Sequence, residues 1–197
     1  TLTYTEDYDA AGNFSENHTA VIDGTITITD DDDDNLASAI VAISSGYVTG
    51  DILTLVPPSG IDTTYNAGVL TIIGTKSKGD YKNLLESITY HSTNENPTQN
   101  NPSASRTITW EVTDANSDEA GSKTSSPATS TINIIPSNDV PVVSDAGGTL
   151  VYTENDPPEI IDGTIAITDN DDDNLASATV TISSGYLVGY VLTLVPP

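Results

Sequence analysis

The chain has 197 residues and a formal net charge of −24, with 29 Asp and Glu against 5 Lys and Arg. This charge argues against nucleic acid and anionic membranes as partners, because few basic groups are present to neutralise phosphates. The absence of cysteine excludes disulfides and thiolate metal sites. No run of residues is long and apolar enough for insertion into a membrane.

Alternating β-branched and apolar residues predict strands along much of the chain. In chain order, the expected strands cover residues 1–6, 23–30, 38–44, 69–74, 87–92, 106–114 and 129–136. One short helix is expected within residues 78–88, where Tyr81, Leu84, Leu85 and Ile88 share a face at helical spacing. About seven strands, turn-rich loops and no long helix indicate an all-β fold, an antiparallel β-sandwich with immunoglobulin-like topology.

A long internal repeat organises the chain. Residues 162–197 match residues 23–58 without gaps at 28 of 36 positions, and residues 149–155 match residues 1–7. A period of about 140 residues suits a whole domain better than a solenoid unit. We therefore expect tandem β-sandwich repeats, the first over residues 1–139 and the N-terminal part of a second, incomplete one over residues 140–197. Because the chain opens inside an expected strand, we also expect it to be a piece of a longer protein.

The differences between the two copies follow the period of a strand. Ala39, Val41 and Ile43 are identical in the second copy, whereas the alternate residues Ile40 and Ala42 become threonine. Fixed and variable positions alternate in this way when one face of a strand is buried.

The acidic residues gather in loops at the two ends of the expected sandwich. Five aspartates at residues 30–34 follow the second expected strand, and residues 114–119 follow the sixth. In an immunoglobulin-like topology these two loops lie at the same end. The opposite end holds residues 91–97, the chain exit at 135–141 and Glu6. If repeats stack end to end, this lower pole of one repeat meets the aspartate loop of the next.

Such a junction needs a counter-ion, because two unit charges at about 4 Å repel by roughly 4 kcal/mol at an effective dielectric near 20. Calcium suits it, since this ion takes six to eight oxygen ligands in flexible geometry. Zinc prefers cysteine or histidine, and the only histidines are His18 and His91. Magnesium demands a tighter octahedron and keeps its waters. The alternative is a solvated acidic loop on a salt-adapted surface.

Four short motifs resemble those of cadherin repeats, in the same order along the chain. "ITDDDDDNLASA" resembles the D-x-D motif after the second strand, "YTED" and "YTEN" the x-E-x motif, "VTDAN" the aspartate after the sixth strand, and "IPSNDVP" the N-D-x-P linker. The chain thereby resembles the bacterial cadherin-like tandem repeats of large calcium-dependent surface adhesins and extracellular matrix proteins. Such a protein is extracellular or lies on the bacterial cell surface.

The resemblance implies a set of Ca²⁺ ligands. At the junction between the copies they would be Glu6, Asn138, Asp139, Asp169 and Asp171, with Glu95 as a further candidate. Three others, Asp30, Asp32 and Asp114, would face a preceding repeat. "NEN" replaces the D-x-E of the family and the linker is poorer in acid, so we expect fewer calcium ions per junction.

Other functions fit the sequence less well. An EF-hand fails because Asn35 stands where glycine belongs and Val41 where the bidentate glutamate belongs. Neither histidine has a recognisable catalytic context, so we expect no enzyme. We expect Trp110 in the core. Three hypotheses remain. The first is a calcium-stiffened repeat, which contacts neighbouring repeats of its own chain and a cell-surface or polysaccharide ligand. The second is a self-associating filament subunit completed by strands of a neighbouring chain, and the third is a carbohydrate-binding accessory module.

Overall fold

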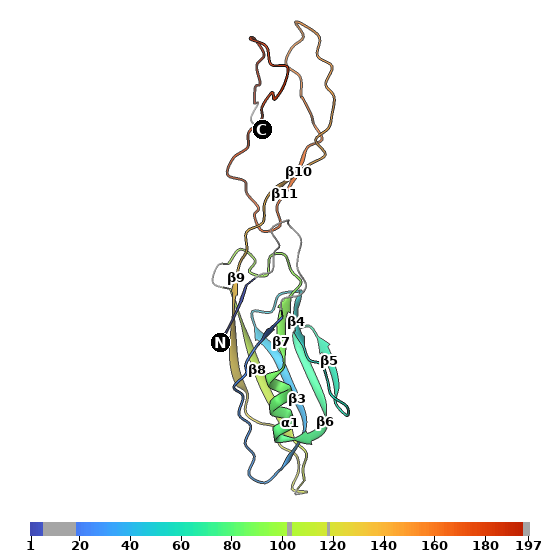
Figure 1. The fold of residues 1–197 in the computed structure, drawn as a ribbon, viewed down its shortest axis with the longest axis vertical. Helices are drawn as coiled ribbons and strands as arrows, with labels where there is room; N and C mark the ends of the chain where they lie inside the picture. The colour runs from blue at the N-terminus through green and yellow to red at the C-terminus, as the bar shows by residue number, and fades with distance from the viewer. Residues whose placement is uncertain (6–18, 102–103, 118, 195–197) are drawn as a thin grey trace.

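The computed structural model of the protein describes residues 1–5, 19–101, 104–117 and 119–194. The chain is mostly β, with one short helix among these residues. Figure 1 shows an elongated molecule, in which a thicker part that holds strands β1 to β9 continues through a narrow connection into a looser part. No helix in the described ranges is long and apolar enough to cross a membrane.

The larger sheet has six strands in the order β1-β9-β8-β3-β6-β5. They are β1 (Leu2–Thr5), β9 (Ala128–Ile135), β8 (Ser105–Asp114), β3 (Asn35–Ser45), β6 (Val69–Ser77) and β5 (Asp62–Asn66). The strands expected near these positions from the alternation of residues are confirmed, and β5 was not expected. All neighbours in this sheet are antiparallel except β1, which runs parallel to β9. The sheet therefore departs from a purely antiparallel arrangement at this edge.

A smaller sheet and the helix complete the first part of the chain. The sheet has the order β2-β7-β4, from β2 (Ala20–Val21), β7 (Thr89–Ser92) and β4 (Asp51–Thr54). Helix α1 covers Lys78–Glu86. Ser77 is its N-cap residue, and the Ser77 hydroxyl accepts a hydrogen bond from the Asp80 amide at 3.1 Å. It buries Tyr81, Leu84 and Leu85, so the helix predicted from their spacing is confirmed.

Both sheets and the helix share one hydrophobic core. Ala39, Val41 and Ile43 of β3 are buried, while the alternate residue Ile40 is 42% exposed, as the comparison of the two copies predicts. Trp110 is buried as expected, and its indole N–H donates to the Ser130 hydroxyl at 3.1 Å. The other buried apolar side chains include Ile22, Leu36, Leu53, Ile72, Ile88, Ile108 and Ile132.

The strand expected at residues 23–30 does not form. Thr25 donates from its amide and its hydroxyl to the Asp23 carboxylate, at 3.0 and 2.8 Å. The segment therefore starts with a turn that the Asp23 side chain closes. Ile26 and Ile28 still pack against the core, which explains the strand-like alternation. No ladder is assigned to this segment in the described chain; its contact with β9 is instead through side chains, since the Ser130 hydroxyl donates to Asp23 Oδ2 at 2.8 Å.

The repeated segment has a different structure in the second copy. A short pair of strands, β10 (Val142–Ser144) and β11 (Ala166–Thr168), is the only ladder assigned within residues 140–194. Leu36 is 2% exposed in the first copy, whereas the matching Leu175 is 44% exposed. The difference arises because β6 and β8, which flank β3, have no counterpart among residues 140–194.

Candidate metal centre

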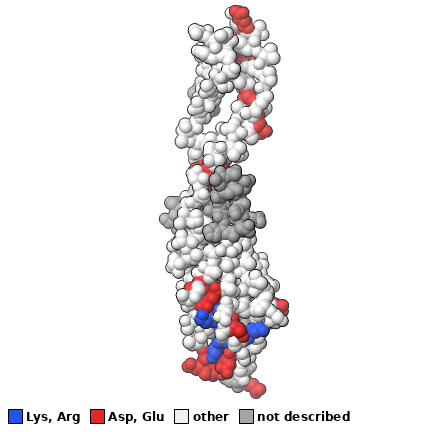
Figure 2. Space-filling model, viewed as in Figure 1, with Lys and Arg blue, Asp and Glu red and all other residues white. Residues whose placement is uncertain are grey.

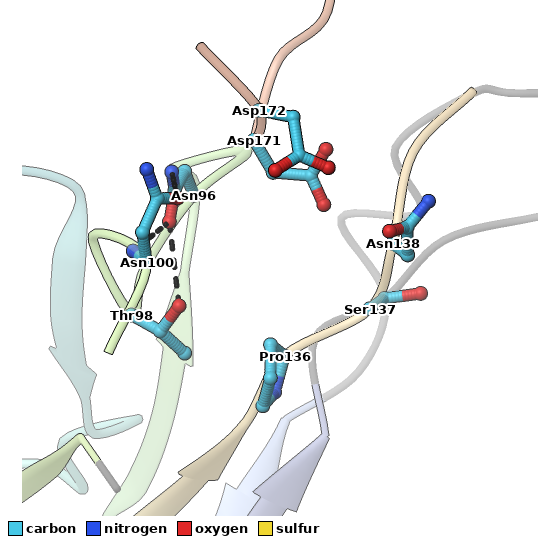
Figure 3. Close-up of a pocket in the computed structure, with 8 residues that line it drawn as sticks. All are labelled: Asn96, Thr98, Asn100, Pro136, Ser137, Asn138, Asp171 and Asp172. Atoms are coloured by element: carbon cyan, nitrogen blue, oxygen red, sulfur yellow. Dashed lines mark hydrogen bonds between the residues drawn. The ribbon is translucent and has the colours of Figure 1, made fainter. Parts of the chain in front are cut away.

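Three segments meet where the first part of the chain joins the second. They are the exit from β9 (residues 136–139), the loop after β7 (residues 93–101) and the aspartate loop of the second copy (residues 169–173), and we call their meeting place the junction (Figure 3). Asp139 connects two of them, because its amide donates to Asp171 Oδ2 at 3.1 Å. This contact brings the exit of the first copy against the aspartate loop of the second.

A tight turn sets the positions of the aspartates in this loop. Asp169 Oδ1 accepts hydrogen bonds from the amides of Asp171 and Asp172, at 3.3 and 3.0 Å. Carboxylate oxygens of these three residues lie within 4.8 Å of one another. Among the described residues, this is the group of acidic side chains spaced closely enough to hold a metal ion.

Two buried carboxylate oxygens of the junction have no hydrogen-bond partner among the residues that the structure describes. They are Asp139 Oδ2 and Asp171 Oδ1, and Asp139 as a whole is only 4% exposed. Buried polar atoms are almost always paired, and an unpaired charged group carries a desolvation cost. Within the described residues, these two oxygens therefore lack a hydrogen-bond donor or a cation that would compensate their burial.

The pKa values of neighbouring groups respond to this crowding. Burial raises the pKa of Asp171, and the adjacent Asp169 and Asp139 carboxylates raise it further. Burial, followed by the charge of Asp139, also raises the pKa of Glu95 on the loop after β7. Hydrogen bonds lower the pKa of Asp169, and the largest contribution comes from the side chain of Asp171. Four carboxyl groups from three segments thus share one electrostatic environment.

Among the described residues, no lysine or arginine forms an ion pair with these carboxylates. The chain has no lysine or arginine after Lys123, whereas ten acidic residues follow it. In Figure 2 the blue basic side chains gather at the lower end of the first part, far from the junction. Arg106 lies in the core and is bound to Asp51, with 2.6 Å between its Nε and Asp51 Oδ2. Within the described part of the chain, the charge of the junction is therefore left for a counter-ion from solution to balance.

An open pocket of about 220 Å³ lies beside the carboxylates. Figure 3 shows the loop after β7 on one side of it, Ser137 and Asn138 on the other, and Asp171 and Asp172 above. All of its lining residues except Pro136 have polar side chains; they are Asn96, Thr98, Asn100, Pro136, Ser137, Asn138, Asp171 and Asp172. A hydrated ion can therefore reach the carboxylates from this side.

The aspartate loop of the first copy has the same turn but other partners. Asp30 Oδ1 accepts from the amides of Asp32 and Asp33 at 3.3 and 3.0 Å, matching the distances in the second copy. Here Lys78 Nζ donates to the Asp30 carbonyl at 2.6 Å and lies 3.9 Å from Asp34 Oδ1. This end of the molecule therefore has its own cation.

Asp114 lies at the same end, as the topology predicts. The Ser117 amide donates to Asp33 Oδ1, so the loops at 30–34 and 114–119 are in contact. Both oxygens of Asp114 accept backbone N–H groups, from Asn116 at 3.0 Å and from Lys123 at 2.6 Å. In this structure Asp114 closes its own loop, and a metal-binding role for Asp30, Asp32 and Asp114 stays a prediction.

The structure brings together most of the ligands expected at the junction. Asn138, Asp139, Asp169 and Asp171 all lie there, and Glu95 is close enough to interact electrostatically with Asp139. Glu6 lies outside the described residues. Sequence reasoning missed Asp172, although both copies keep an aspartate at its position, a signal that could have identified it.

In comparisons with protein-family models, curated proteins and solved structures, the chain has no match. The interpretation of the junction therefore depends on the residues and geometry of this chain.

Proposed function

We propose that this chain is a calcium-stiffened part of an extracellular or surface-anchored bacterial protein, built from tandem cadherin-like β-sandwich repeats and serving as a spacer or adhesive element. One observation carries the proposal: two buried carboxylate oxygens, on Asp139 and Asp171, have no hydrogen-bond partner among the described residues at the point where the two copies meet. A bound cation would satisfy both oxygens and join the two segments that carry them.

The donor set favours calcium over other ions. Every candidate ligand at the junction offers an oxygen: Asp139, Asp169, Asp171, Asp172, the Asn138 amide and, as a further candidate, Glu95. Zinc is disfavoured because no cysteine is present. Calcium accepts six to eight oxygens in irregular geometry, while magnesium requires a near-ideal octahedron and retains its waters. Waters from the adjacent pocket can complete a calcium coordination shell.

The mechanical consequence follows from where the ligands are located. Asp139 belongs to the exit from β9, whereas Asp169 and Asp171 belong to the second copy. An ion bound to both fixes the angle between them. Without the ion the carboxylates repel one another, and the junction bends and stretches. Because binding requires the assembled junction, the ion also stabilises it by mass action.

Calcium titration by isothermal calorimetry tests this proposal. The variant Asp169→Asn/Asp171→Asn should lose or strongly weaken binding. Asp145→Asn/Asp156→Asn is the control, since it removes the same two charges from exposed side chains of the second copy that are not candidate ligands. It should leave junction binding intact. Absence of heat with the unmodified chain, or equal loss in both variants, would contradict the proposal.

A second candidate function is a filament subunit completed by strands of a neighbouring chain. It is favoured by the exposed apolar residues of the second copy: Val180 and Leu194 are 74% and 86% exposed, whereas the matching Val41 and Leu55 are 0% and 9% exposed. Sedimentation velocity over a hundredfold concentration range distinguishes the two candidates. Growing polymers support the filament, and a monomer at every concentration opposes it.

A further inference from the structure

The loop after β7, residues 93–101, forms one wall of the junction. Asn96, Thr98 and Asn100 of this loop face Asn138 and Asp171 across the pocket (Figure 3). A loop of this length is not held in place by ladder pairing. The position of the loop relative to the acidic residues therefore depends on the core groups and neighbouring turns that hydrogen-bond to it.

The central anchor is an ion pair in the core. Arg106 of β8 is 2% exposed and Asp51 of β4 is 1% exposed. Arg106 donates from Nε to Asp51 Oδ2 at 2.6 Å and from Nη2 to Asp51 Oδ1 at 3.1 Å. The same Nη2 donates to the carbonyl of Pro97 at 2.7 Å. One guanidinium thus connects both sheets to the middle of the loop.

Further bonds hold the start of the loop to the turn before β4. The Thr93 amide donates to the Gly50 carbonyl at 2.9 Å, and the Asn94 side chain donates to the Thr49 carbonyl at 3.0 Å. The Asn94 side chain also accepts from the Asn96 amide at 2.8 Å. The loop is therefore fixed at both Asn94 and Pro97, on either side of Glu95 and Asn96.

We infer that Arg106 and Asp51 are positioning residues for the ion-binding junction: the buried pair holds the 93–101 wall in place for the cation. This inference rests on the proposed function. A buried ion pair is weak evidence for stability, because apolar residues of similar volume often replace such a pair without loss.

Groups that orient metal ligands without touching the metal typically contribute 10–100-fold to affinity. Arg106 is such a group here, because its contact with the Pro97 carbonyl is two residues from Glu95. Lysine retains the charge opposite Asp51, but it lacks the planar set of donors that serves two acceptors at once. Arg106→Lys should therefore loosen the wall while keeping a cation in the core.

Two measurements on the full chain test the inference: calcium affinity by calorimetry, and amide hydrogen exchange of residues 93–101 in chelator. Arg106→Lys should weaken calcium binding about tenfold and speed exchange in the loop. Should that variant fail to fold, Asp51→Asn/Arg106→Met serves instead, because it removes both charges and keeps the core filled. Ile72→Val is the control, a fully buried residue of β6 that lowers stability without touching the loop.

Each outcome supports or overturns the positioning role of Arg106 and Asp51. Weaker calcium binding and faster loop exchange in the arginine variants, with neither in Ile72→Val, support the inference. Unchanged affinity and exchange, or equal effects in the control, overturn it. If the unmodified chain binds no calcium, the proposed function fails and the inferred role toward a cation fails with it. Exchange then decides separately whether the ion pair holds the loop.

Discussion

Replacing Asp139 by asparagine removes one charge from the junction with almost no change in shape. The side chain is 4% exposed, and its Oδ2 has no partner in the described chain. Without calcium, the wild-type chain bears the desolvation cost of this oxygen and its repulsion from Asp171. Asp139→Asn removes the repulsion and replaces the charge by a neutral amide, which is less costly to bury, so the metal-free protein should become more stable.

The size of the effect follows from these two contributions. An unsatisfied buried polar group costs about 1–3 kcal/mol. Two unit charges at about 4 Å repel by roughly 4 kcal/mol at an effective dielectric near 20, which is an upper bound here, because Asp171 is partly exposed and solvent screens most of the repulsion. We expect a net gain of about 1–2 kcal/mol. For a chain of this size, about 1 kcal/mol shifts the Tm by about 2–4 °C.

Calcium should reverse the advantage. At a calcium concentration of about 100 Kd, binding stabilises the wild type by about 2.7 kcal/mol. If loss of one carboxylate weakens affinity tenfold, the same concentration stabilises the variant by only about 1.4 kcal/mol. Asp139→Asn should therefore raise the Tm in chelator and halve the Tm increase caused by calcium.

Thermal unfolding with and without calcium measures both quantities. Asp145→Asn is the matched control, because it removes the same charge from an exposed side chain of the following segment. It should change neither quantity appreciably. A lower Tm of Asp139→Asn in chelator, or an unchanged calcium increment, would refute the reasoning.

Three further predictions follow. The raised pKa values of Asp171 and Glu95 mean that the folded chain binds more protons than the unfolded chain, between the ordinary carboxyl values and the raised ones. Stability in chelator should rise as the pH falls through this window, while calcium affinity, measured by calorimetry, should fall; parallel changes would contradict this. Tyr4→Phe removes the acceptor of the buried Ser92 amide and should cost about 1 kcal/mol in denaturant unfolding, whereas the matching exposed Tyr152→Phe should be neutral. Chelator should broaden the small-angle scattering distance distribution of the chain, and an unchanged curve would argue against a calcium-dependent junction.

Much of the fold could be predicted from local patterns in the sequence. The buried face of β3 was visible because Ala39, Val41 and Ile43 persist while Ile40 changes between the copies. Helix α1 was visible because Tyr81 and Leu85 recur at its period. Both patterns depend only on neighbours along the chain, which is why sequence alone was sufficient.

Features that depend on distant residues could not be predicted in this way. Residues 23–30 alternate like a strand, but the Asp23 side chain accepts hydrogen bonds from Thr25 and from Ser130 of β9, and no ladder is assigned to this segment. The parallel pairing of β1 with β9 joins opposite ends of the domain sequence. The pairing of Arg106 with Asp51 across 55 residues leaves no periodic signal.

The acidic junction lies between these cases. Asp169 and Asp171 stood out in the sequence through their spacing. The expected order of the loops placed Asp139 at the end of the first copy that meets the aspartate loop of the second. That Asp139 is buried with an unpaired oxygen required the three-dimensional structure, because burial at this position results from the meeting of two copies.

The central claim is that calcium fixes the angle between the two copies, and a distance distribution across the junction tests it most directly. Because the chain has no cysteine, spin labels can be attached at Ser45→Cys and Ala146→Cys, two exposed positions on either side of the junction. Double electron–electron resonance should give a narrow distribution with calcium and a broad one with chelator, and Asp169→Asn/Asp171→Asn should stay broad in both. Distributions of equal width with calcium and with chelator would contradict the account.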